Sequence, residues 1–174
     1  MKKSKNVTKF VALGLTGLSF SAAVIAADVS MSDKRFMKNA AQAGMFEIEG
    51  SKLALTKAKS PEIKSFAQTI IKDHTKASDE LKALAAKKGV ELPDKPSFLQ
   101  RTSLKLMGTH DGAKFDESYA ETIGVDAHES VIEDFTEAAK DADDADVKAF
   151  AGKTLPGLKQ HYEMAKMLEK KVDK

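Results

Sequence analysis

Residues 60–89 read SPEIKSFAQTIIKDHTKASDELKALAAKKG and carry the signals for both ends of one long helix. Ser60 supplies the hydroxyl favoured at an N-cap. Pro61 suits the first helical position, because its φ is already fixed and its missing N–H would find no partner there. At the other end two lysines complement the helix dipole, and Gly89 tolerates the left-handed backbone that often ends a helix. We therefore predict a helix at 60–88.

One face of this helix is apolar, with a histidine in its middle. The apolar residues recur at three- and four-residue steps, which is typical of a helix packed against a core. The face consists of Ile63, Phe66, Ala67, Ile70, His74, Ala77, Leu81, Leu84 and Ala85. His74 is therefore expected to be buried.

The same signals predict three more long helices and one short one. The long helices are expected at about 32–58, 113–140 and 145–172, and the short amphipathic helix at 97–107. Ser32-Asp33 can cap the first of them. The segment between Gly89 and Gly112 contains two prolines that exclude a continuous helix. It is long enough to run the length of a bundle, so the third long helix could start at either end.

Tight turns arrange the long helices in pairs. Lys59-Ser60 leaves room only for an antiparallel hairpin, and the aspartate-rich turn around Asp143 predicts a second one. The hairpins share a weak repeat, IKSFA at 63–67 and VKAFA at 147–151. Two related hairpins facing each other predict an all-α fold, a four-helix bundle.

The first 27 residues have the pattern of a secretory signal peptide. Lysines at the start precede an apolar run, Phe10 to Ile25, and Ala26-Ala27 offer small residues for cleavage. A retained membrane anchor is the alternative. The rest, 28–174, is long enough for one domain with its own core and has no transmembrane segment. It contains no cysteine, which excludes lipid attachment, disulfides and thiolate sites.

Charge does not support nucleic-acid binding. The leader contains four of the 28 basic residues and none of the 26 acidic ones, so the remaining chain is slightly acidic. The sequence leaves open whether the protein has a protein partner in the cell envelope, and it leaves open the oligomeric state.

Each long helix places one metal-competent side chain in the middle of its apolar face. These are Glu47, His74, His128 and His161. Counted from the turns at about 1.5 Å per residue, partners within a hairpin differ in height by roughly a turn or less. All four are near mid-helix, so they should converge.

Three imidazoles and one carboxylate suit a single zinc, iron, manganese or copper ion. The alternative is a purely structural polar layer, in which each imidazole bonds a carboxylate, hydroxyl or water. The two differ in geometry, because ligand atoms more than about 5 Å apart could not share an ion.

Other polar residues near these positions are expected to play no part. Asp73, Asp126 and Glu129 precede or follow the histidines and point away from them, so they would be solvated unless they act from a neighbouring helix. Tyr119 is expected to pack at the rim of the polar layer, and Met164 to fill the core. His110 is expected to be a solvated loop residue.

No motif for covalent or phosphoryl chemistry occurs. The chain has no nucleophile elbow, phosphate loop or zinc-peptidase motif. Binding is therefore favoured over turnover, and no catalytic residue is assigned.

Three stretches resemble one family. They are GMFEIEGSKLALTKAKSPEIKSFAQTIIKDH at 44–74, FDESYAETIGVDAHESVIEDF at 115–135 and DVKAFAGKTLPGLKQHYEMA at 146–165. They are similar to the exported bacterial family catalogued as domain of unknown function 4142. The resemblance implies a ferritin-like bundle in the periplasm, with a possible outer-membrane association, but it implies no reaction.

The residues do not follow the pattern of a di-iron ferritin. Such a site takes a Glu from two helices and Glu-x-x-His from the other two. The positions three before the histidines are Ile71, Val125 and Leu158, so the bridging carboxylates are missing. Ferroxidase and iron-storage activity are not supported.

Three hypotheses follow from the sequence. The first is a periplasmic bundle that binds one metal ion, with a role in binding or stress protection. The second is a structural or interaction protein of the envelope, whose histidines only specify the core. The third is an oxidoreductase that uses a single metal.

Overall fold

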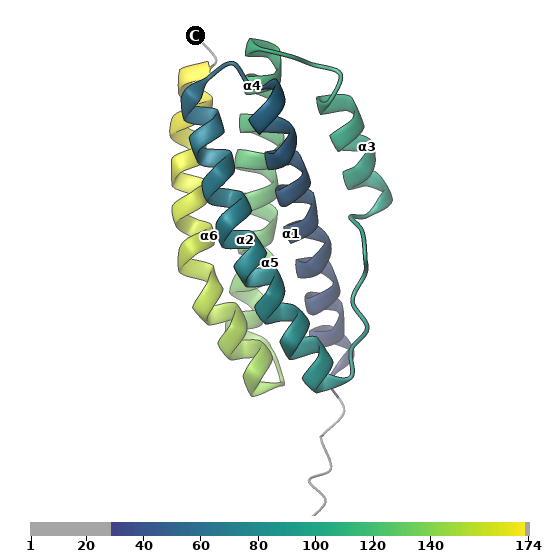
Figure 1. The fold of residues 1–174 in the computed structure, drawn as a ribbon. Helices are drawn as coiled ribbons and strands as arrows, with labels where there is room; N and C mark the ends of the chain where they lie inside the picture. Colours follow the sequence, from purple (N-terminus) through teal and green to yellow (C-terminus); the bar gives the residue numbers. More distant parts are fainter. Residues whose placement is uncertain (1–28, 173–174) are drawn as a thin grey trace, which may run out of the picture.

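The computed structural model describes residues 29–172, which form a helical bundle (Figure 1). Its elements are α1 (Met31–Lys57), α2 (Pro61–Lys88), α3 (Phe98–Met107), α4 (Ala113–Tyr119), the π-helix η1 (Ala120–Asp126), α5 (Ala127–Asp141) and α6 (Ala145–Val172). The four long helical segments and the short helix are confirmed, with ends within a residue or two of those predicted.

The long segments form two antiparallel hairpins. α1 packs mainly against α2, and α5 against α6. The connection after Gly89 carries α3 back along the bundle, and the Gly112 N–H then donates to the Lys57 carbonyl at 3.0 Å. α4 therefore starts at the end of the bundle that holds the α1–α2 turn, as Figure 1 shows. This contact settles the direction that the sequence left open.

A buried aspartate from each hairpin holds the turn of the other. Asp33, at the start of α1, accepts from the backbone N–H groups of Asp143 and Asp144 at 3.4 and 2.8 Å. Asp116, in α4, accepts from those of Lys59 and Ser60 at 3.0 and 2.8 Å. We name these two aspartates the turn clamps.

The expected cap at Ser32-Asp33 is therefore wrong. The N-cap of α1 is Ser30, whose hydroxyl accepts from the Asp33 N–H at 3.1 Å. The Asp33 carboxylate instead accepts hydrogen bonds from two backbone N–H groups of the turn before α6. These bonds explain why the carboxylate can be buried.

The core consists of two apolar clusters with a polar layer between them. One cluster gathers around Phe36, Phe135 and Phe150, and the other around Phe66 and Phe115. On α2, α5 and α6 the histidine lies between the residues of one cluster and those of the other.

The π-helix is the main departure from the predicted elements. Its wider turns change which residues of the third long segment face inward. Ile123 is fully buried in this segment, whereas Val125 is half-buried and packs against the same apolar cluster. α1 comes close at this point, since a Cβ on Gly50 would lie 2.6 Å from the Ile123 Cδ1 atom.

None of the helices within residues 29–172 combines the length and the apolar character that a membrane span requires. The predicted signal peptide lies outside the described residues. His110 is exposed in the loop before α4, as expected.

Candidate metal centre

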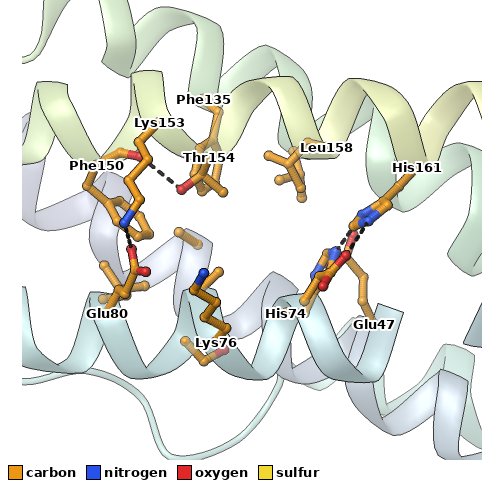
Figure 2. Close-up of a pocket in the computed structure, with 18 residues that line it drawn as sticks. Glu47, His74, Lys76, Glu80, Phe135, Phe150, Lys153, Thr154, Leu158 and His161 are labelled. Atoms are coloured by element: carbon orange, nitrogen blue, oxygen red, sulfur yellow. Dashed lines mark hydrogen bonds and ion pairs between the residues drawn. The ribbon is translucent and has the colours of Figure 1, made fainter. Parts of the chain in front are cut away.

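Four polar side chains meet in the layer between the two apolar clusters. Glu47 comes from α1, His74 from α2, His128 from α5 and His161 from α6 (Figure 2 shows three of them). All four are buried, with exposed fractions of 1%, 6%, 0% and 5%. The convergence of these four side chains, predicted from helix heights, is confirmed.

Each imidazole has one nitrogen on an oxygen acceptor. The Nδ1 of His74 lies 2.8 Å from the Glu47 Oε2 atom. The Nε2 of His161 lies 3.2 Å from the Asp73 Oδ2 atom, and the Nδ1 of His128 lies 2.9 Å from the Ile123 carbonyl oxygen. Such partners fix the tautomer of a histidine and direct its other nitrogen, as they do for histidines that bind metals.

The remaining nitrogens face each other. The Nε2 of His74 and the Nδ1 of His161 are 3.2 Å apart. If both rings donate their other N–H to a carboxylate, these facing atoms are two lone pairs, and only a cation between them or a proton on one of them relieves the repulsion. Across the three rings, one nitrogen of each lies within 4.8 Å of the others.

The π-helix explains the position of His128. Its Nδ1 reaches the carbonyl of Ile123, five residues earlier, beside the widened turns of η1. The Nε2 atom of the same ring is buried without a hydrogen-bond partner in the described structure. A buried polar atom left in this way costs free energy, so it marks a position where a ligand would be stabilising.

Glu47 lies on the hairpin partner of α2 and is the buried carboxylate of the layer. Burial, the largest influence on its pKa, opposes ionisation, but attraction to His74 and His128 outweighs it and lowers the pKa below the usual value. Its Oε1 atom has no hydrogen-bond partner and lies 3.5 Å from the Nδ1 of His128. Glu47 is thus ionised and holds His74 in place.

The three histidines are in different electrostatic environments. Burial lowers the pKa of His128 and that of His161. Burial also acts against a proton on His74, but the charge of Glu47 and its hydrogen bond outweigh burial and raise the His74 pKa. Two of the rings are therefore held neutral, which is the form that binds a metal ion.

Of the expectations about neighbouring residues, the one for Tyr119 is wrong. The expectation for Asp73 is met in both of its parts: the residue is exposed, and it acts from a neighbouring helix, with its Oδ2 atom 3.2 Å from the His161 Nε2 atom on α6. Tyr119 was expected at the rim, but it is fully buried, its hydroxyl lies 2.7 Å from that of Ser51, and burial raises its pKa. Asp126 and Glu129 are exposed, as expected. Met164 packs against the core.

Sequence reasoning left one partner of the histidines open, Asp73, and missed the other, the Ile123 carbonyl. The Asp73 contact follows from the relative rotation of α2 and α6, and the Ile123 contact from the π-helix. An aspartate one position before a buried histidine was the only available signal, and it points away from that histidine on its own helix.

A cavity of about 250 Å³ adjoins the histidines. Glu47, His74 and His161 lie at one end of it, and the rest of its lining is mainly apolar but includes Lys76, Glu80, Lys153 and Thr154 (Figure 2). The cavity is bordered by α2 and α6, where Lys76 and Gly157 line it. The histidine cluster is therefore accessible to a small molecule from one side.

The donor set fits one ion and not two. Three nitrogens lie within coordinating reach of each other, and Glu47 is the carboxylate that is buried beside them. A di-iron centre needs several bridging carboxylates, which residues 29–172 do not bring to this layer.

Comparison with known proteins gives a family but no function. No curated protein and no solved structure matches the chain. A family model described as a domain of unknown function, DUF4142, matches residues 19–168. The match covers nearly all of the chain, and the chain therefore belongs to this family.

Proposed function

We propose that the protein is an exported, ferritin-like four-helix bundle that binds one transition metal ion in its core. His74, His128 and His161 would be the ligands. Glu47 would orient His74 and balance part of the positive charge. The role would be binding or stress protection, with no turnover assigned.

The facing pair of nitrogens carries this proposal. The Nε2 of His74 and the Nδ1 of His161 are 3.2 Å apart. Two imidazole nitrogens bonded to one tetrahedral zinc ion at about 2.0–2.1 Å would be about 3.3 Å apart. The partnerless Nε2 of His128 supplies the third donor. Zinc, iron, manganese and copper all accept imidazole, so the donors leave the metal open.

A structural polar layer is the second candidate, and one observation favours it. The His74 Nδ1 atom lies 2.8 Å from the Glu47 carboxylate, and the pKa of His74 is raised. These observations describe a buried ion pair, in which a proton on His74, and not a metal ion, balances the charge of Glu47. In that case the protein would be a structural or interaction component of the cell envelope.

Metal analysis of the purified protein distinguishes the two. We expect roughly one equivalent of a transition metal in protein prepared without chelators, because three histidines form one binding site for one ion. In His128→Ala the metal content should fall to background, while His110→Ala, the matched control in the exposed loop, should retain it.

The variant must also be shown to be folded. Circular dichroism and a thermal melt would be recorded with and without zinc. A folded His128→Ala that keeps the wild-type metal content contradicts the proposal, and so does a wild-type protein that binds no metal and gains no thermal stability from added zinc. Redox activity that scales with metal content would instead favour the single-metal oxidoreductase.

Export is a separate part of the proposal. It is supported by the basic and apolar pattern of residues 1–27. Fractionation of cells that express the full chain should recover a shortened protein in the periplasm, with or without outer-membrane association. Recovery of the full-length chain from the cytoplasm would contradict export without affecting the metal site.

A further inference from the structure

The cavity beside the histidines has a polar end and an apolar body. The imidazoles of His74 and His161 and the carboxylate of Glu47 form the polar end. The body is lined mainly by the apolar side chains Leu81, Val131, Phe135, Phe150 and Leu158, with Thr154, Lys76, Glu80 and Lys153 also on its wall. Figure 2 shows Phe135 and Phe150 at the side of the cavity away from the histidines. A ligand that fills it would need one donor atom and an apolar remainder.

We propose that this cavity binds a small aromatic monocarboxylate, whose carboxylate completes the coordination of the metal ion and whose ring packs between Phe135 and Leu158. This inference rests on the proposed metal site and names the class of ligand that the site would take.

The size of the cavity limits the ligand. An apolar cavity of about 150 Å³ in another protein is known to take up benzene. The cavity here has a volume of about 250 Å³. It therefore has room for one ring and a short polar substituent, but it is smaller than the roughly 300–1,000 Å³ sites that bind drug-sized molecules.

Charge favours an anion at the polar end. Three neutral imidazoles leave a divalent ion with its full charge, and Glu47 offsets one unit, so a single carboxylate would neutralise the rest. The other charged residues of the lining add little, because they are mixed in sign. Lys153 is paired with Glu80 at 2.8 Å, and Asp73 and Lys76, of opposite charge, also line the cavity. The attraction for the carboxylate therefore comes from the metal ion.

Gly157 offers a way to close the cavity without touching a metal ligand. It is an exposed residue of α6 that lines the cavity, and a Cβ built there would meet no heavy atom within 4 Å. A Gly157→Leu side chain would take up space in the cavity. Gly152→Leu is the matched control, since a Cβ there also meets nothing within 4 Å and the residue does not line the cavity.

The test is calorimetric titration of the full chain, zinc-loaded and metal-free, with benzoate and with acetate. Zinc-loaded protein should bind benzoate roughly 30-fold more tightly than acetate, because the ring of benzoate is buried against apolar walls. Gly157→Leu should lose at least about ten-fold in benzoate affinity and keep its zinc. Gly152→Leu should behave as the wild type.

The outcomes separate this inference from the proposed function. Zinc binding without benzoate binding overturns the ligand and leaves the metal site intact. Equal benzoate affinity with and without zinc also overturns it, since the carboxylate would then not bind the ion. Equal loss of benzoate affinity in both glycine variants overturns the assignment to this cavity. Absence of zinc binding overturns the proposed function itself.

Discussion

At the scale of single residues, the site depends on what holds each imidazole. Glu47 orients His74, and a hydrogen-bond acceptor of this kind typically changes metal affinity by about 10–100-fold when it is removed. We expect Glu47→Gln to weaken metal binding by that factor, measured by competition with a chromophoric chelator. Gln keeps the size of the side chain but not its charge.

Glu49→Gln is the matched control, because Glu49 is exposed on the same helix and its substitution removes the same charge. Its metal affinity should equal that of the wild type. Equal affinity in Glu47→Gln would mean that the carboxylate does not support His74 in the metal-bound protein.

The four converging side chains could be predicted from the sequence, but the bonds that direct them could not. Helical periodicity and the distance from a turn fix depth and face, and these placed Glu47 and the three histidines correctly. The contact of Asp73 with His161 depends on the rotation of α2 against α6, which no local pattern encodes. The contact between the His128 Nδ1 atom and the Ile123 carbonyl oxygen depends on the π-helix, which the sequence does not predict.

At the scale of the elements, the turn clamps join the two hairpins. Each accepts two backbone N–H groups from a turn of the other hairpin. We expect Asp116→Ala to lower the free energy of unfolding by about 2–3 kcal/mol, since the buried donors lose a charged acceptor. Asp33→Ala should cost a similar amount, measured by urea unfolding.

Two further variants complete this prediction. The double variant should show additive losses, because the clamps hold different turns and share no partner. Asp79→Ala, at an exposed site paired only with Lys82 on its own helix, should stay within about 0.5 kcal/mol of the wild type. If the free energy of unfolding of Asp116→Ala equals that of the wild type, the prediction is contradicted, because water would then replace the carboxylate at no cost in stability.

The helices themselves follow from local rules, and so their bounds could be predicted closely. Ser60, Pro61 and Gly89 act at the ends of α2 as expected, with Gly89 in the left-handed region at φ 65°. The π-helix is different, because α- and π-hydrogen bonding use the same residue types. The segment packs tightly against α6, since a Cβ built on Gly124 would lie 3.0 Å from the Ala165 Cβ atom.

At the scale of the whole molecule, a charge network also joins the hairpins at the end opposite to the α1–α2 turn. The Lys88 ammonium contacts the carboxylates of Asp144 and Asp146 at 2.6 and 2.8 Å. Hydrogen bonds from Lys88 and then Lys87 lower the pKa of Asp146 from 3.8 to about 2. A carboxyl with a lowered folded-state pKa stabilises the fold above its unfolded value and loses that contribution as the pH falls through the folded one.

We therefore expect stability to fall between about pH 4 and pH 2, and Asp146→Asn to flatten this part of the profile. Urea midpoints at about pH 6 and at steps below pH 4 would measure it. Added salt of about 1 M should reduce the difference, because the side chains of Lys87 and Asp146 are 68% and 45% exposed and salt screens their attraction. An unchanged slope in Asp146→Asn would assign the acid loss to other carboxylates.

The turn clamps have a consequence for how the chain reaches its final form. They join residues that are 110 and 56 positions apart in the sequence. The backbone N–H groups of each turn therefore gain their carboxylate acceptor only when the other hairpin has packed beside it. Each half of the chain is a template for the other, and neither is a separable module. The bundle should accordingly melt in one step, with both ends lost together.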